Sequence, residues 1–154
     1  MWLFSDAACT RKYDSGWDGL KLFGSSRAPQ LFSMEKDGYY QIDAVSDINN
    51  TNLGFQAGED VNYTLTFTHN NLNTQYAAVF LVDVLENKII DIGVSGAEYN
   101  FMAESTPQAT NRFQIVTRHY EKDTADNDSQ IKIFSAERNV FVENLSNTSG
   151  ELMI

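Results

Sequence analysis

The chain has 154 residues, of which 42% are hydrophobic and 21% charged, and its formal net charge is −10. This length is typical of one domain and suffices for a hydrophobic core without disulfides or metals. Because no stretch approaches the roughly 18 consecutive apolar residues of a membrane-spanning helix, and because an acidic surface repels nucleic-acid backbones and anionic lipids, we expect neither nucleic acid binding nor membrane insertion.

Short segments in which apolar and polar residues alternate recur along the chain, as is typical of β-strands. In the clearest one, residues 62–69, the side chains of Tyr63, Leu65 and Phe67 share one face and threonines share the other. Turn residues separate these segments, and no helical periodicity exceeds two turns. The predicted strands, in chain order, cover residues 2–4, 19–23, 39–45, 62–69, 76–85, 112–117, 130–134 and 139–142.

Three segments carry more detailed predictions. Residues 76–85 are apolar at nearly every position, which predicts a central strand covered on both faces. Residues 82–92 predict a strand, a tight turn at 86–88 and a second strand. Residues 53–55, followed by Gly58, predict a bend between sheets in which glycine takes a positive φ.

The number and spacing of these strands predict an all-β fold, a two-sheet β-sandwich of jelly-roll or Ig-like type, over residues 1–120. Residues 121–129 are charged, contain no large apolar side chain and predict an acidic linker. Residues 130–154 offer too few strands to enclose a core and stop inside an apolar run at 152–154. We therefore expect a truncated β segment that pairs with an edge of the first domain or with another chain.

The last segment resembles the opening of the C-terminal sorting domain of type IX secretion cargo in Bacteroidetes. The residues that carry this resemblance are IKIF (131–134), NVFVEN (139–144) and GELMI (150–154). The preceding part is similar to the β-sandwich module that stands ahead of that sorting domain in large surface proteins. Its matching motifs are DSGWDGLKLFG (14–24), PQLF (29–32), LGFQAGED (53–60), YTL (63–65), VDVLEN (82–87), IDI (90–92), YNF (99–101) and RF (112–113).

This resemblance implies a secreted or cell-surface protein, associated with the outer membrane, and a sandwich that is not catalytic. The other domains of a larger parent protein would be its partners, together with a glycan or protein ligand at the surface. We expect a structural spacer or adhesion module, and the alternative is a carbohydrate-binding module that serves a polysaccharide-degrading enzyme.

The turn at residues 14–18 combines two carboxylates with an indole. Asp14 and Asp18 are oxygen ligands of the kind Ca²⁺ takes, and the Trp17 ring could stack on a sugar. The opposing interpretation is that Trp17 packs into the sandwich while the aspartates are solvated, because the spacing is not that of a complete calcium loop. No other cofactor is expected.

Tyrosines supply the remaining candidates for a ligand-binding surface. If residues 39–45 form a strand, one of the adjacent Tyr39 and Tyr40 points outward, and Tyr76 begins another strand. An exposed tyrosine on a sandwich face is a frequent contact for carbohydrate or protein, although it can also lack any partner.

No pattern identifies catalytic residues. Cys9 has no histidine near it in sequence, and we expect a small core residue. A hydrolase would require His69 or His119 in a pocket with carboxylates within hydrogen-bond reach. For His69 we expect a partly buried, hydrogen-bonded side chain.

Overall fold

The computed structural model describes residues 1–106, 108–120, 131–136 and 139–144, and for the last two segments it describes the backbone. The chain divides into two compact units, Met1–Tyr120 and Glu121–Ile154, which are treated separately below. The predicted acidic linker at 121–129 and the apolar end at 152–154 lie outside the described residues.

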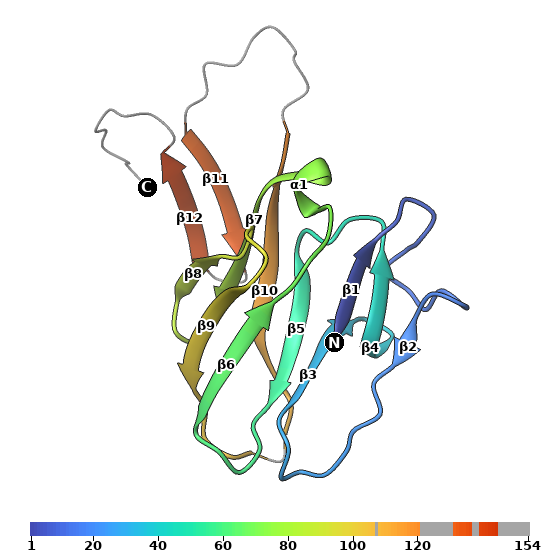
Figure 1. Cartoon of the computed structure of the whole chain (residues 1–154), viewed down its shortest axis with the longest axis vertical. Helices are drawn as coiled ribbons and strands as arrows, with labels where there is room; N and C mark the ends of the chain where they lie inside the picture. The colour runs from blue at the N-terminus through green and yellow to red at the C-terminus, as the bar shows by residue number, and fades with distance from the viewer. Residues whose placement is uncertain (107, 121–130, 137–138, 145–154) are drawn as a thin grey trace, which may run out of the picture. The chain divides into compact units, whose positions relative to one another are not determined.

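The first unit is almost entirely β-structure (Figure 1). Its one described helix, α1 (Leu72–Gln75), is a single turn, and no helix among the described residues is long and apolar enough to cross a membrane. Its strands are β1 (Trp2–Ser5), β2 (Gly19–Leu20), β3 (Gln30–Glu35), β4 (Gly38–Val45), β5 (Thr51–Gln56), β6 (Asn62–Phe67), β7 (Tyr76–Asp83), β8 (Lys88–Asp91), β9 (Ala97–Met102) and β10 (Thr110–His119).

Within the described part of this unit, the strands form two sheets of unequal size. The large sheet has the order β1-β4-β3-β5-β10-β7-β8, with β2 also paired to β4, and the small sheet consists of β6 and β9. All pairs are antiparallel except β1 with β4, which run parallel. The predicted two-sheet β-sandwich is confirmed, whereas its jelly-roll or Ig-like topology stays a prediction.

The core lies between the two sheets and is rich in aromatic rings. Phe55 and Phe113 from the large sheet meet Phe101 from the small sheet, with ring centroids 5.1 Å and 5.2 Å apart. Tyr63 and Tyr99 extend the cluster on the small-sheet side. Each large buried side chain contributes about 1.5–3 kcal/mol to folding, so packing stabilises this sandwich without a disulfide, the one cysteine, Cys9, being buried and free.

Three predictions about strands are confirmed. In β6 the side chains of Tyr63, Leu65 and Phe67 are half-buried and the residues between them are exposed. β7 and β8 form the predicted hairpin, in which Asn87 takes a left-handed φ of 52°. In β7, Leu81 faces the core cluster and Val82, on the opposite face, is also fully buried.

The predicted bend at residues 53–55 is wrong. These residues lie inside β5, which pairs with both β3 and β10, and neither Gly54 nor Gly58 has a positive φ. Gly54 is needed for close packing, because its strand partner Phe32 places an aromatic ring over the position that a Cβ would occupy. The glycine therefore marks a crowded sheet and not a turn.

The second unit contains a two-stranded antiparallel pair, β11 (Ile131–Ala136) with β12 (Asn139–Asn144). Each strand extends beyond the residues predicted for it, 130–134 and 139–142. Its expected pairing with an edge of the first domain or with another chain stays a prediction.

Candidate functional site

The two predicted calcium ligands organise a loop. An Asp14 carboxylate oxygen accepts hydrogen bonds from the backbone N–H (2.6 Å) and the hydroxyl (3.1 Å) of Thr10. The Asp18 carboxylate accepts from the N–H of Asp14 (2.7 Å) and from that of Ala44 in β4 (2.8 Å). Among the described residues no group of three His, Cys, Asp or Glu side chains could hold a metal, and calcium binding stays a prediction.

The four predicted ligand-binding aromatics do not form one surface. Tyr40 (1% exposed) and Tyr76 (3%) are buried, whereas Trp17 (51%) and Tyr39 (42%) are exposed. The Tyr40 hydroxyl donates to Asp37 (2.9 Å), and burial together with this hydrogen bond raises the pKa of Tyr40. Strand alternation therefore turns Tyr39 outward, and of these four predicted residues only Trp17 and Tyr39 offer a ring to a ligand.

Tyr39 lies beside a hollow of about 550 Å³. The hollow is lined by Phe23, Gly24, Ser26, Tyr39, Gln56, Gln108 and Ala109. Phe23 and Tyr39 are in edge contact, with centroids 6.0 Å apart, and both pack on Phe32, which is fully buried.

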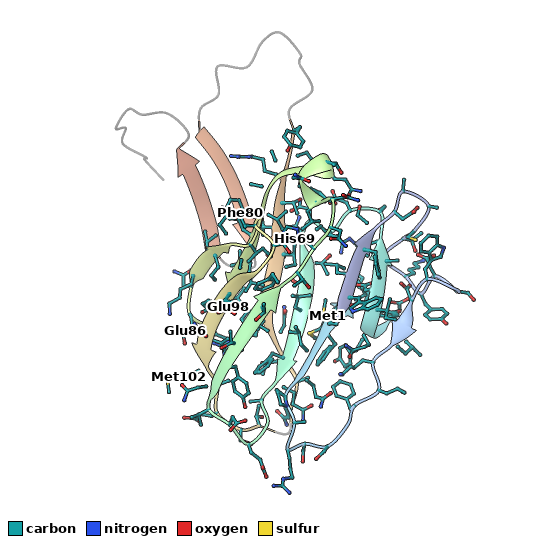
Figure 2. The ribbon with its side chains drawn as sticks, in the orientation of Figure 1. Met1, His69, Phe80, Glu86, Glu98 and Met102 are labelled. Carbon is teal, nitrogen blue, oxygen red and sulfur yellow. The ribbon has the colours of Figure 1, made fainter. Side chains whose placement is uncertain are left out.

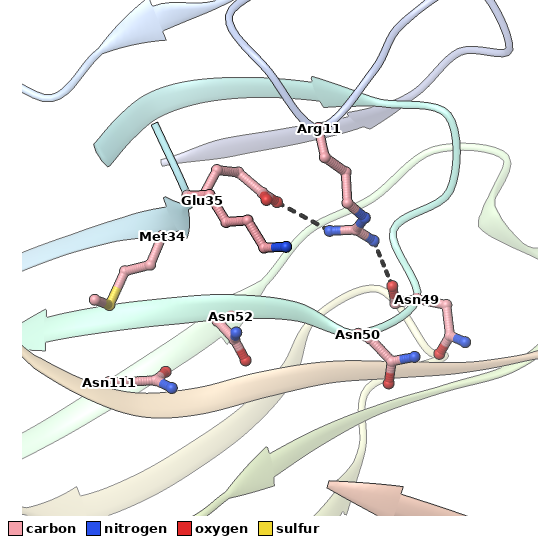
Figure 3. Close-up of a pocket in the computed structure, with 8 residues that line it drawn as sticks. Arg11, Met34, Glu35, Asn49, Asn50, Asn52 and Asn111 are labelled. Carbon is pink, nitrogen blue, oxygen red and sulfur yellow. Dashed lines mark hydrogen bonds and ion pairs between the residues drawn. The ribbon is translucent and has the colours of Figure 1, made fainter. Parts of the chain in front are cut away.

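A second hollow, of about 430 Å³, is lined mostly by polar and charged residues (Figure 3). The Arg11 guanidinium contributes to its lining and ties the loop after β1 to the sheet, donating to Glu35 (2.9 Å) and to the backbone carbonyls of Asp47 and Asn49. The guanidinium also donates to the hydroxyl of Thr51. Its hydrogen-bond donors are thus engaged within the protein, and the Glu35 carboxylate balances its charge. The full lining is Arg11, Met34, Glu35, Lys36, Asn49, Asn50, Asn52 and Asn111.

Neither histidine lies in an enclosed pocket with acid–base partners. His69, just beyond β6 (Figure 2), is half-buried as expected, and its Nε2 is 3.1 Å from the carbonyl oxygen of Ile92. His119 Nε2 is 3.0 Å from an Asp47 carboxylate oxygen, but 56% of its side chain is exposed. This pair is open to water and lacks the enclosure of a hydrolase site.

The most enclosed polar cluster joins the two sheets. The Arg112 guanidinium, 4% exposed, donates to the fully buried Asp83 carboxylate at 2.9 Å, and the Tyr99 hydroxyl of the small sheet donates to the same carboxylate at 3.0 Å. Arg112 also donates to the carbonyl of Met102 (2.9 Å) and lies over the Phe101 ring. Because the two charges of this cluster are paired with each other, we interpret it as a structural link between the layers.

This cluster makes the fold sensitive to alkali. Burial, followed by the hydrogen bond to Asp83, raises the pKa of Tyr99 to about 12 from an ordinary value of 10. Since the folded pKa is the higher one, the stabilisation is complete below pH 10 and is lost as the pH rises toward 12. For the wild-type chain, we expect the urea concentration at the unfolding midpoint to decrease as the pH is raised from 10 toward 12. Tyr99→Phe should be less stable at neutral pH and should lose this part of the decline, and an equal decline in the variant would contradict the assignment.

Sequence reasoning missed three members of these sites. The sequence predicts Phe23 as the end of a strand over residues 19–23, whereas β2 ends at Leu20 and Phe23 lies beyond it. Arg112 begins the predicted strand over residues 112–117, and no sequence pattern indicates its buried partner Asp83. That Gln56 lines the same hollow as Tyr39 has no signal in the sequence, because it depends on the register of β3, β4 and β5.

The fold and these sites define a disulfide-free β-sandwich module with exposed aromatic side chains on one sheet face. Over 111 residues the chain is 34% identical to the minor fimbrium subunit Mfa5 of Porphyromonas gingivalis, an alignment that covers 68% of this chain and 8% of that protein. The chain thus spans a small fraction of the length of the curated relative it matches. No protein-family model and no solved structure matches the chain.

Proposed function

We propose that this chain is a structural and adhesive β-sandwich module of a larger cell-surface protein of fimbrial type. The observation that carries the proposal is the 34% identity to a fimbrial subunit over 68% of the chain. The compact unit Met1–Tyr120 has its own aromatic core. This supports the proposal, because a unit with its own core can form one domain of a longer multidomain chain. On this proposal its partners are the neighbouring domains of the same protein and other subunits of the assembly.

The proposal assigns no catalytic activity to the module. His69 forms a hydrogen bond with a backbone carbonyl, and His119 forms one with the exposed Asp47. The buried charges of Asp83 and Arg112 are paired with each other. A role as a spacer agrees with these features, because a spacer requires a stable core and no reactive group.

Localisation tests the proposed function directly. Antibodies raised against the purified chain would be applied to intact cells of the source bacterium and, separately, to lysed cells. In immunogold electron microscopy we expect the antibody to label surface filaments or the outer surface of intact cells. Protease added outside the cells should remove the epitope. Label that requires lysis and resists external protease would contradict the proposal.

The resemblance of residues 131–154 to the start of a sorting domain belongs to the same proposal. Deletion of the chain from residue 130 onward in the full-length protein should leave the product inside the cell envelope while the sandwich still folds. Deletion of an equal length from another module of the same protein is the control. Normal surface display without this segment would remove the sorting interpretation and leave the surface-module proposal intact.

A further inference from the structure

The hollow beside Phe23 and Tyr39 lies on the face of the large sheet that points away from the core. Leu53 and Phe55 of β5 belong to the core, so Gly54 and Gln56 point to the opposite face. Phe32 pairs with Gly54, and Tyr39 is brought to the same face by its pairing with Met34. This aromatic face is therefore built by strand register and does not depend on loop placement alone.

Two aromatic rings form a corner over a buried base. Phe32 is fully buried, while Phe23 and Tyr39, which pack on it, are 46% and 42% exposed. The planes of Phe23 and Tyr39 meet at 83°, so one ring can serve as a floor and the other as a wall for a flat ligand. Both rings are held in place by Phe32, which lowers the entropy lost on binding.

The remaining lining is polar and uncharged. Gln56, only 8% exposed, together with Gln108 and Ser26, lines the hollow next to the rings. Each amide offers both donors and an acceptor, and a hydroxyl offers both roles. The volume of about 550 Å³ lies within the range of small-molecule sites. The combination of aromatic faces with neutral donors and acceptors matches a ligand that has one apolar face and a rim of hydroxyl groups.

Other ligand classes fit this hollow less well. No charged side chain belongs to its lining. The Lys21 ammonium lies 5.9 Å from the centroid of the Phe23 ring, but the net charge of −10 disfavours anions. A purely apolar ligand would bury the glutamine amides without partners. A peptide added as a strand requires a free sheet edge, whereas β3 and β5 are each paired on both sides.

We propose that this hollow is a binding site for a neutral glycan. A pyranose ring stacks on Tyr39 or Phe23, and its hydroxyl groups exchange hydrogen bonds with Gln56 and Gln108. The site is independent of the fimbrial proposal, since a sandwich module can bind a glycan in any surface protein.

The test uses the full chain on an array of neutral oligosaccharides built from glucose, galactose, mannose and N-acetylglucosamine, with sialylated and sulfated glycans on the same array. We expect the chain to bind at least one series of neutral oligosaccharides on the array, and Tyr39→Ala and Phe23→Ala to bind it roughly tenfold more weakly.

Three further variants complete the test. Tyr39→Phe keeps the ring and should bind within a few-fold of wild type. Gln108→Ala removes only an exposed amide and should weaken binding with no loss of folding. Leu22→Ala, at an exposed apolar residue next to Phe23, is the matched control and should bind as wild type does.

Titration of the best array ligand, followed by NMR, locates the site independently of folding effects in the variants. The side-chain amide signals of Gln56 and Gln108 should shift, and those of Asn52 should not. Retention of no neutral glycan, binding unaffected in Tyr39→Ala and Phe23→Ala, preference for anionic glycans, or shifts confined to the surroundings of Trp17 would each overturn the proposal. Binding of peptides at this hollow in place of glycans would overturn it equally.

Discussion

Replacing Asp83 with leucine should lower the free energy of unfolding by about 3–5 kcal/mol, the usual effect of breaking a buried ion pair by removing one partner. The Arg112 guanidinium would remain in the core without its counter-ion. The Tyr99 hydroxyl and the N–H groups of Leu85 and Glu86 would lose their acceptor as well. Urea denaturation followed by tryptophan fluorescence and circular dichroism measures the change.

The double variant Asp83→Leu/Arg112→Leu distinguishes the ion pair from simple loss of packing. Because both charges are gone, its destabilisation should fall short of the sum of the two single variants by about 0.5–3 kcal/mol. The exposed pair Arg27 and Glu59, with side chains 76% and 57% exposed, is the matched control, and breaking it should cost at most about 1 kcal/mol. Equal costs at the two pairs, or additive effects of Asp83→Leu and Arg112→Leu, would contradict this account of the core.

Gly54→Val should destabilise the chain by about 3 kcal/mol, at the upper end of the usual cost of overpacking. A Cβ at this position would lie 2.5 Å from Cζ of Phe32 and 2.8 Å from the sulfur of Met34. Phe32 is fully buried and cannot move into solvent. The gain from a less flexible unfolded chain and better strand propensity, about 0.5–1 kcal/mol, is too small to compensate. Thermal and urea unfolding of the purified variant measure the difference.

A compensating substitution tests the cause of this effect. Phe32→Leu vacates part of the space that the valine needs, so Gly54→Val/Phe32→Leu should be less destabilised than the sum of the two single variants. Gly38→Ala is the control, because a Cβ there would meet only the Tyr40 side chain at ordinary contact distance, 3.5 Å. If Gly38→Ala were as harmful as Gly54→Val, the clash with Phe32 would not be the reason.

Alternation of side chains was enough to predict the sandwich, because it reports directly which residues meet water. It identified β6 and the β7–β8 hairpin, and it required one of Tyr39 and Tyr40 to point outward. It could not say which one, since that depends on the partner strand. It also failed at β5. A glycine that makes room for the Phe32 ring cannot be distinguished in sequence from a glycine that forms a turn.

The sites were less predictable because they join distant parts of the chain. Arg112 and Asp83 are 29 positions apart, and their pairing follows from the register of β10 with β7. The meeting of Phe23 with Tyr39 requires the segment after β2 to cross the outer face of β3 and β4. Neither arrangement has a local pattern, whereas the turn at Asp14 and Asp18 does. In that turn one oxygen of Asp14 and both oxygens of Asp18 accept hydrogen bonds from backbone N–H groups.

The Asp83 carboxylate and the Arg112 guanidinium tie β9 to β7 and β10, so the small sheet cannot detach without breaking the hydrogen bond from Tyr99 to Asp83 and the one from Arg112 to the carbonyl of Met102. The amide protons of β9 should therefore exchange with deuterium no faster than those of β10, in a single cooperative opening. In the role proposed above, as one module of a larger cell-surface protein, this coupling would disfavour partial unfolding of the sandwich under mechanical load.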